Sequence, residues 1–346
     1  MELALYHPQH GYYSSAIGKN IGRSGDFFTS VSVGDTFGLL LSHAIEKKWQ
    51  RICPDGDNPL IIVEQGAHDG QLARDIIDAL RLRNSPLYES MQYRIVEPRE
   101  SIRRELRENI DGTLYSPRLY PVESLEKARA ERGVFLCNEL LDAFPVRRFV
   151  WNNGKWKDVC VSFDSEEGQL IESEEDVANG DGDFDRFLNL VGEDRDFPEG
   201  YVTEFCPGVK YWVEECSRLF ENGGCWIVID YGFEAEEYFS ELRKTGTLKC
   251  YRDHRTHDDA LDLPGETDIS AHVNFTDLLR EAEKAGLPGG ALSDQSRFLT
   301  RAAESWLRSM EGQIPDAESA ARLRQFQTLT HPAMMGRSFQ VVEFEK

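Results

Sequence analysis

The sequence predicts an α/β fold built around a parallel sheet, and three observations lead to this prediction. Apolar runs of strand length recur along the chain, as expected for strands that are buried on both faces. Patterns of helical period separate these runs, so that strands and helices alternate. A glycine-containing turn follows the first run, and the carboxyl ends of parallel strands are where open α/β sheets bind their ligands.

The elements can be assigned in chain order from these patterns. Strand-length apolar runs occur at residues 60–63, 93–96, 134–137, 225–229 and 339–344. Helical patterns occur at residues 37–49, 72–80 and 209–220, and again from about residue 276. This alternation is the basis for expecting a Rossmann-like sheet.

One region interrupts the alternation. Residues 148–163 have the signature of a β-hairpin, with Asn153-Gly154 as its turn. The following stretch, 164–196, is strongly acidic and weakly apolar, and we expect a solvated, partly mobile insertion there. We therefore expect extra segments within the core at about 148–200 and 246–330.

The charge of the chain restricts its partners. The formal net charge is −22, which has the wrong sign for binding nucleic-acid phosphates and favours a basic protein segment. An acidic surface that only provides solubility is the alternative. We expect no membrane span, because no run of 18 apolar residues exists. Seven cysteines without a Cys-x-x-Cys pair, and a start without a secretory signal, predict a cytoplasmic protein.

The turn after the first strand is the first candidate site. It runs from Glu64 through Gly66, His68 and Gly70, between the strand and the next helix. Glycine lets the backbone approach a ligand, and the N–H groups of the helix start face that ligand. Alternatively, the turn needs glycine for its geometry alone.

Polar residues follow two other strands. Glu97 ends the second strand, where a carboxylate accepts hydrogen bonds from the ribose hydroxyls of a nucleotide-like cofactor. Asn138, Glu139 and Asp142 come directly after a buried strand, where a substrate would lie against that cofactor. The alternatives are that Glu97 supports a helix dipole and that Asn138 caps a short helix. An NAD enzyme would share Glu97 and the glycine turn.

The His- and Asp-rich segment at 246–275 suggests a metal, but its spacing fits no ligand pattern and its two arginines would repel a cation. We therefore expect no metal site and a loop fixed by ion pairs.

Taken together, these segments resemble the MidA family of protein arginine methyltransferases, which includes mitochondrial complex I assembly methyltransferases. The matching segments run in family order over nearly the whole chain: Tyr6-His7-Pro8, Gly11-Tyr12-Tyr13, Gly25-Asp26-Phe27, Thr29, Phe37-Gly38, Glu64-x-Gly66, Gly70, Val96-Glu97, Asn138-Glu139, Asp142 to Val146, Ile229 to Gly232, and parts of Gly246 to Val273.

The resemblance implies a seven-stranded class I methyltransferase sheet with extra helices, an inserted hairpin and an antiparallel last strand near Val341. It also implies that residues 1–55 form a cofactor-covering segment and helix, ahead of a core at 56–346. S-adenosylmethionine is the implied cofactor. Its implied contacts are Thr29, Glu64, Gly66, Gly70, Glu97, Asn138 and Glu139.

The chain departs from the family at two places. Gly66-Ala67-His68-Asp69-Gly70 replaces the usual Gly-Pro-Gly-Arg-Gly, which bears on cofactor affinity. We hypothesise that His68 contacts the methionine portion of the cofactor, where an imidazole can hydrogen-bond to the carboxylate. Ser30-Val31-Ser32 replaces the usual Ala-Pro-Glu and removes a carboxylate.

The expected reaction is direct methyl transfer to an arginine of a protein substrate that presents a basic segment. A guanidinium needs carboxylates for bidentate pairing. The candidates are Glu139, Asp142 and Glu204, in descending order. The alternatives are an inactive, cofactor-binding assembly factor and a nicotinamide-dependent oxidoreductase. A homodimer is a further hypothesis for the assembly.

Overall fold

The computed structural model describes residues 1–14, 29–54, 59–192, 195–252 and 255–346. The chain divides into two compact units that interleave in sequence. We call the first the sheet unit, made of Phe28–Leu140, Val213–Tyr231 and Ala282–Lys346. The second is the insertion unit, made of Met1–Phe27, Leu141–Trp212 and Gly232–Glu281. The sequence-based division of the chain at residue 55 remains a prediction.

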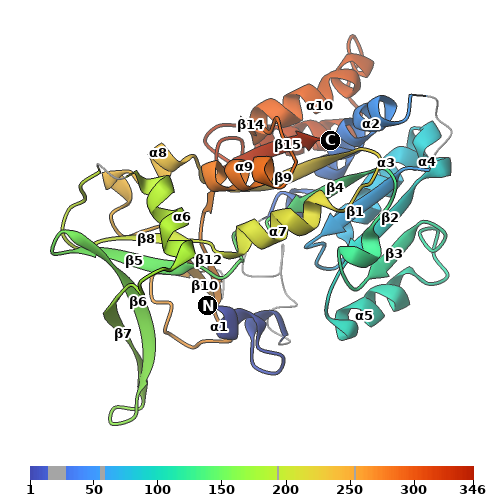
Figure 1. The fold of residues 1–346 in the computed structure, drawn as a ribbon. Helices are drawn as coiled ribbons and strands as arrows, with labels where there is room; N and C mark the ends of the chain where they lie inside the picture. Colours follow the sequence, from blue (N-terminus) through green and yellow to red (C-terminus); the bar gives the residue numbers. More distant parts are fainter. Residues whose placement is uncertain (15–28, 55–58, 193–194, 253–254) are drawn as a thin grey trace. The chain divides into compact units, whose positions relative to one another are not determined.

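The sheet unit contains the predicted parallel sheet. Its strands run in the order β14-β15-β9-β4-β1-β2-β3 (Figure 1). They are β1 (Ile61–Gln65), β2 (Gln92–Val96), β3 (Leu119–Val122), β4 (Gly133–Asn138), β9 (Gly224–Phe233), β14 (Ala291–Asp294) and β15 (Phe339–Glu345). The first five pair in parallel, whereas β15 is antiparallel to β9, as expected. A further short strand, β13 (Val273–Asn274), pairs with the end of β9.

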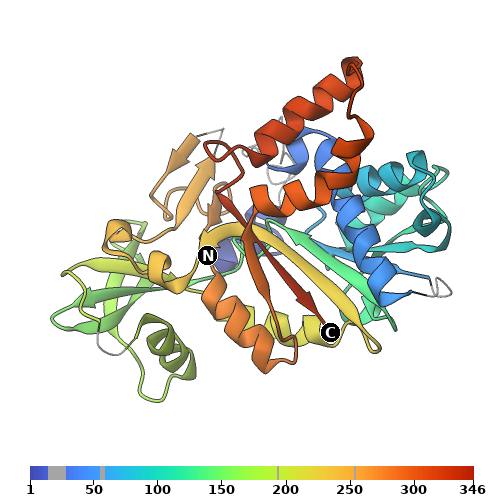
Figure 2. The same cartoon turned by 90° about the horizontal axis from the view of Figure 1, so that it is seen from above.

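Helices pack on the sheet through apolar side chains at helical spacing. The helices are α2 (Thr36–Ile52), α3 (Gln71–Leu82), α4 (Pro86–Ser90), α5 (Glu100–Ile110), α10 (Gln295–Ser309) and α11 (Ala317–Thr330). Phe37 and Leu40 of α2 join Ile76 of α3 and Leu299 of α10 in one hydrophobic cluster with the strands. Figure 2 shows α10 and α11 beside α2, with which both are in contact. On the opposite face, the Trp226 indole donates to the Cys216 carbonyl at 3.1 Å.

The insertion unit contains two small sheets. One has the order β7-β6-β5-β8 and the other the order β11-β10-β12. The strands are β5 (Arg147–Asn152), β6 (Lys155–Asp164), β7 (Gln169–Asp176), β8 (Tyr201–Phe205), β10 (Lys249–Arg252), β11 (Arg255–His257) and β12 (Asp268–Ser270). The helices are α1 (Glu2–Tyr6), α6 (Gly182–Val191), α7 (Gly208–Ser217, which continues into the sheet unit), α8 (Ala235–Tyr238) and α9 (Phe275–Lys284). Short 3₁₀ turns are η1 (Tyr12–Ser14) and η5 (Glu241–Arg243) in this unit, and η3 (Val31–Val33) and η4 (Glu126–Ala128) in the sheet unit.

The hairpin prediction is confirmed, and the described part of the acidic stretch after it contains regular elements, whereas its mobility remains a prediction. Asn153 and Gly154, at the turn between β5 and β6, both have positive φ, 53° and 72°, as two-residue hairpin turns require. The stretch at 164–196 contains strand β7 and helix α6. Asp181 caps α6 by accepting from two backbone N–H groups, and Phe187 of α6 is buried under the small sheet. The helix forms because it has an apolar face to bury.

Among the described residues, no helix combines the length and apolar character needed to cross a membrane. No group of His, Cys, Asp and Glu in the same residues has the arrangement of a metal site.

Candidate functional site

The glycine turn lies where the sequence predicts it, between β1 and α3 of the sheet unit. Gly66 has φ 83° and Gly70 has φ 76°, a region that L-residues rarely adopt. A Cβ atom at Gly66 would lie 3.2 Å from Leu140 Cδ1, in the loop after β4. Gly70 precedes the first residue of α3, so this turn places a helix start at the carboxyl end of β1. Such a helix start favours an anionic ligand group.

His68 adopts a conformation normally left to glycine. Its φ is 48°, and its side chain is half-buried with Nδ1 3.8 Å from Asp69 Oδ1. The backbone therefore holds the imidazole residue in this left-handed conformation. A contact between His68 and the cofactor remains a prediction.

Glu64 is a buried carboxyl on β1. Its side chain is 3% exposed, and its Oε2 accepts a hydrogen bond of 2.7 Å from the Tyr93 hydroxyl on the neighbouring strand β2. Burial raises the pKa of Glu64 to about 7, although the Tyr93 hydrogen bond favours the ionised form. A cationic ligand group beside Glu64 would favour its ionised form.

Glu97, at the carboxyl end of β2, is held by an arginine two residues later. Its Oε1 accepts from the Arg99 backbone N–H at 2.9 Å and from Arg99 Nε at 2.7 Å. Its Oε2 accepts from a terminal guanidinium nitrogen of Arg99 at 2.8 Å. The carboxylate is thus fixed in orientation, and carboxylate oxygens have further lone pairs for ribose hydroxyls. Sequence reasoning did not include Arg99 in the site.

Asn138 and Glu139 form a connected pair at the end of β4. The Asn138 amide donates to Glu139 Oε1 at 2.8 Å, and the Ser30 backbone N–H donates to the same oxygen at 3.3 Å. Glu139 has φ 52°, and its own N–H donates to the Ile229 carbonyl of β9 at 2.9 Å. The other amide atom of Asn138, Oδ1, is buried and accepts no hydrogen bond from the described residues. A buried acceptor of this kind is available to a donor of a bound ligand.

Asp230 on β9 supports this loop. It was not predicted as a site residue and appeared only within the matching segment Ile229 to Gly232. It is fully buried, and its carboxylate accepts from the backbone N–H groups of Leu140 at 3.1 Å and Tyr231 at 2.8 Å. The available sequence signal was a single Asp directly after five buried apolar residues of one strand. Asp230 therefore positions the Asn138–Leu140 loop.

The Thr29 turn joins the same region. Thr29 Oγ1 accepts from the Ser32 N–H at 3.1 Å, and the Ser32 hydroxyl bonds back to the Thr29 backbone. Ser30 is fully buried, and its hydroxyl donates to Gln295 Oε1 at 3.2 Å. Ser32, where the family usually has a carboxylate, closes this turn instead. The matching segment Gly25-Asp26-Phe27 lies outside the described residues.

The sheet unit therefore brings most of the predicted binding residues to the carboxyl ends of β1, β2 and β4. The residues present fit S-adenosylmethionine. They include a helix start, a fixed carboxylate for ribose hydroxyls, and the buried acceptor Asn138 Oδ1.

Asp142 and Glu204, the other two predicted carboxylates, belong to the insertion unit. Burial raises the pKa of Asp142 to about 7. Tyrosines and a second carboxylate surround its segment. The Tyr6 hydroxyl donates to the Ala143 carbonyl at 2.8 Å, and the Tyr13 hydroxyl donates to Asp268 Oδ1 at 3.0 Å. Burial raises the pKa of Tyr13 well above its ordinary value, and the negative charges of Asp268 and Asp142 raise it further.

Glu204 is 1% exposed, and its Oε2 accepts from the Thr247 N–H at 2.7 Å and from the Thr247 hydroxyl at 3.0 Å. Burial raises its pKa. These contacts hold the turn at Gly246 and Thr247, whereas the other oxygen, Oε1, is buried and accepts no hydrogen bond from the described residues. A role of Glu204 in binding the substrate remains a prediction.

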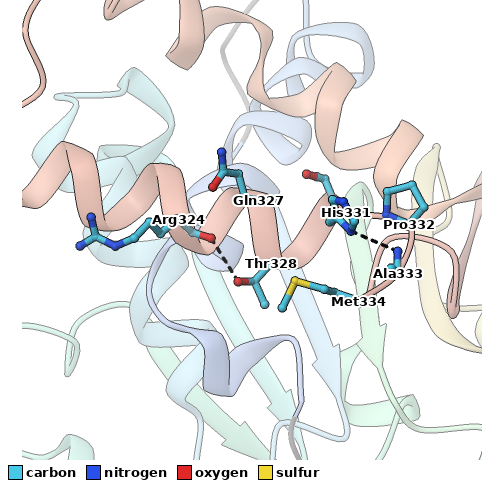
Figure 3. Close-up of a pocket in the computed structure, with 8 residues that line it drawn as sticks. Arg324, Gln327, Thr328, His331, Pro332, Ala333 and Met334 are labelled. Carbon is cyan, nitrogen blue, oxygen red and sulfur yellow. Dashed lines mark hydrogen bonds between the residues drawn. The ribbon is translucent and has the colours of Figure 1, made fainter.

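One cavity of about 770 Å³ lies elsewhere in the sheet unit, at the end of α11 (Figure 3). Its lining residues are Arg324, Gln327, Thr328, Thr330, His331, Pro332, Ala333 and Met334. Two local hydrogen bonds cross this group, from Thr328 to the Arg324 carbonyl and from the Ala333 N–H to His331 Nδ1. None of the predicted site residues lines it.

Comparisons with known proteins agree with this geometry. The model of Methyltransf_28, a family of S-adenosyl-L-methionine-dependent methyltransferases, matches residues 40–289. The chain belongs to this family, because the match covers most of its length.

Similar proteins extend the match to almost the whole chain. The zebrafish (Danio rerio) protein named protein arginine methyltransferase NDUFAF7, mitochondrial, is 25% identical over 98% of this chain and 81% of its own. The Drosophila melanogaster homolog is 27% identical over 98% of this chain and 79% of its own. A solved COG1565 superfamily member from Burkholderia thailandensis, bound to S-adenosyl-homocysteine, covers 100% of this chain and 86% of its own, with 28% identity and a TM-score of 0.83.

These matches confirm the family, the fold class, the methyltransferase activity and the cofactor. They do not favour the nicotinamide-dependent oxidoreductase or the inactive assembly factor. The expectation of a cytoplasmic protein is wrong, because the fish, fly and human relatives are named as mitochondrial proteins. Cysteine usage distinguishes oxidising from reducing compartments, and it does not separate one reducing compartment from another.

Proposed function

We propose that this methyltransferase methylates an arginine side chain of a protein substrate, and that Glu139 is the carboxylate that pairs with the guanidinium. The pair formed by Asn138 and Glu139 is the observation that carries the proposal. It places a carboxylate and a buried, unsatisfied acceptor side by side at the end of β4.

The chemistry requires positioning above all. When bound, S-adenosylmethionine supplies a methyl group on a sulfonium leaving group, so the protein mainly orients the two reactants. Glu139 Oε1 already accepts from the Asn138 amide and the Ser30 N–H, which fix the carboxylate. A fixed carboxylate can pair with two guanidinium N–H groups and so orient the reacting nitrogen.

Two further observations support an arginine substrate. The fish and fly relatives are named protein arginine methyltransferases. The net charge of −22 favours a basic protein segment. Binding of nucleic acid is not part of the proposal, for the same reason.

Asp142 is the second candidate for recognition of the guanidinium. Its pKa of about 7 results from burial, and a guanidinium beside it would favour the ionised form. The Tyr6 and Tyr13 rings, stacked with centroids 5.5 Å apart, provide aromatic faces in the same unit. Guanidinium groups bind such faces. A role of Glu204 in binding the substrate and a homodimer both remain predictions.

The test is methylation of an arginine-rich peptide by the full chain with S-adenosylmethionine, with the product identified by mass spectrometry. Glu139→Gln keeps the shape and removes the charge, and we expect about a hundredfold lower kcat. Glu123→Gln, at an exposed position of the sheet unit, is the matched control and should leave kcat unchanged. Methyl-lysine as the product, or full activity of Glu139→Gln, would contradict the proposal.

A further inference from the structure

The outer part of the β6–β7 hairpin lacks support from the rest of its sheet. Strand β5 pairs with Lys155–Asp158 of β6, whereas β7 pairs with the longer stretch Lys157–Asp164. Residues 159–174 therefore form a two-stranded ribbon, which we call the outer ribbon. Figure 1 shows it extending beyond β5 and β8. Two-stranded hairpins are at best marginally stable alone, so an additional strand would stabilise this one.

The outer ribbon exposes apolar side chains on one face. Phe163 is 65% exposed and Val161 is 52% exposed. They share a face because they are two residues apart in one strand, and Leu170 lies opposite Phe163 in register. Soluble proteins normally avoid apolar residues beside an unpaired strand edge, because such an edge pairs with other chains.

Strand β7 is the outer strand of its sheet, and among the described residues no strand pairs with its outer side. One face of β7 carries Glu172, Glu174 and Asp176 at alternate positions, and Val161 lies opposite Glu172 on this face. Residues 158–185 contain eleven Asp and Glu and no Lys or Arg. The negative charge of this segment therefore equals half of the net charge of −22. This edge therefore repels another acidic strand, including that of a second copy of the chain, and attracts a basic one.

The acids of β7 already pair with cations of their own sheet. Glu172 pairs with Arg148, Glu174 with Lys157, and Asp176 with Lys155. Exposed pairs of this kind contribute little to stability, so a partner's cations can replace them at small cost.

We propose that the outer ribbon and the β7 edge form a docking surface for an extended basic segment of a protein partner. The segment adds as a strand beside β7, with its Arg or Lys side chains on the face of Glu172, Glu174 and Asp176 and its apolar side chains on the opposite face, beside the exposed Ile171. Main-chain hydrogen bonds provide affinity in this mode of binding, and alternate side chains provide selectivity. That the partner is the methylated protein itself rests on the proposed function.

The experiment measures binding to the full chain without methyl transfer. The probe is a short fluorescein-labelled peptide of alternating arginine and valine, followed by fluorescence anisotropy. A peptide of alternating glutamate and valine is its control. Hydrogen exchange should show protection of residues 169–176 when the arginine peptide binds, because their outward backbone groups become paired. Protection confined to another segment overturns the proposal.

Two variants test the side chains. Neutralising the edge as Glu172→Gln, Glu174→Gln and Asp176→Asn should weaken peptide binding about tenfold. The matched control, Glu108→Gln, Glu123→Gln and Glu131→Gln, makes the same change of net charge at exposed positions of the sheet unit and should leave binding unchanged. Ile171→Thr keeps a strand-favouring residue and should weaken binding severalfold. Unfolding profiles like that of the wild type show that each variant is folded.

The proposal is overturned if the edge variant binds the peptide as the wild type does, or if the control variant loses as much affinity. It is also overturned if the outer ribbon pairs with a second copy, seen as a dimer in sedimentation that Phe163→Thr abolishes. Failure of the proposed function can be told apart from failure of the docking proposal. A protein that binds the peptide at β7 but methylates no arginine refutes only the proposed function. Calorimetry with S-adenosyl-homocysteine should give the same affinity for wild type and edge variant.

Discussion

Acidic residues serve two different purposes at the carboxyl edge of the large sheet and on the β6–β7 hairpin. At the sheet edge they are few, buried and oriented, as Glu64 is by Tyr93 and Glu97 by Arg99. On the hairpin they are numerous, exposed and paired with flexible cations, as Asp176 is with Lys155. Burial raises the pKa of Glu64 to about 7, whereas the hydrogen bond and charge of Lys155 lower the pKa of Asp176. Environment, more than residue type, determines what a carboxylate can do.

The largest effect is expected on the free energy of unfolding, from a substitution of the buried Glu64. Its pKa is raised from 4.5 to about 7 in the folded state. As pH rises through this window, the unfolded chain releases the proton first, so the folded state loses stability. The loss approaches about 3 kcal/mol and levels off above the folded pKa. Glu64→Gln removes this contribution and can still accept from Tyr93.

Urea unfolding of wild type and Glu64→Gln at about pH 5 and about pH 8 measures the effect. We expect the variant to gain stability relative to the wild type at the higher pH. A difference between the two proteins that does not change with pH would show that Glu64 titrates normally.

The next effect concerns the ribose contact. Glu97→Ala removes a charged acceptor of two hydroxyls, and we expect ten- to a hundredfold weaker binding of S-adenosylmethionine by calorimetry. Arg99→Ala is the informative control, since it removes the group that orients Glu97 and leaves the carboxylate in place. It should weaken binding less than Glu97→Ala does. Unchanged affinity in Glu97→Ala would mean that the ribose lies elsewhere.

Substitution of two glycines, one at the sheet edge and one in the β5–β6 turn, should give a smaller effect. Gly66 and Gly154 both have positive φ, 83° and 72°, but a Cβ atom meets Leu140 at 3.2 Å only in the first case. Nothing lies within 4 Å of a Cβ atom at Gly154. Alanine at either position should reduce the free energy of unfolding by about 1 kcal/mol from backbone strain.

Only Gly66→Ala should also weaken binding of the cofactor, because Gly66 lies in the turn beside the proposed site. Calorimetry on both variants measures this difference. Equal cofactor affinity in the two would show that the turn needs glycine for its geometry alone.

Much of this fold could be predicted because its signals are local. The buried runs at β1, β2, β4 and β9 and the turn at Gly66 and Gly70 are contiguous in sequence. Strand β3 contains Pro121 and alternates weakly, so it was missed, and α6 was hidden by its acidic composition. Local patterns reveal an element when its apolar residues recur at the helical or strand period and are not obscured by neighbouring charges.

The predicted site residues could be named from sequence, but their supporting contacts could not. The hydrogen bond from Tyr93 to Glu64 depends on the register between β1 and β2. The hydrogen bond from the Leu140 N–H to Asp230 joins the loop after β4 to the neighbouring strand β9. Tyr13 and Asp268 are 255 positions apart. Contacts at this separation follow from the packing of the whole fold. The burial of Glu204 and its hydrogen bonds to Thr247 are facts of the same kind.

The smallest expected effect sharpens the contrast between the two regions. Asp176 is exposed at the outer edge of β7, and Lys155 lowers its pKa through a hydrogen bond and through its charge. A lowered pKa means that ionised Asp176 stabilises the folded state above its ordinary pKa, and that this contribution disappears as the pH falls through the lowered value. Both side chains are mostly solvated, so the surrounding water screens their attraction. Asp176→Asn should therefore leave the Tm unchanged near neutral pH, in contrast to Glu64→Gln. Differential scanning calorimetry in low and high salt measures this, and a clear loss of Tm that salt abolishes would show that the ribbon depends on its own ion pairs.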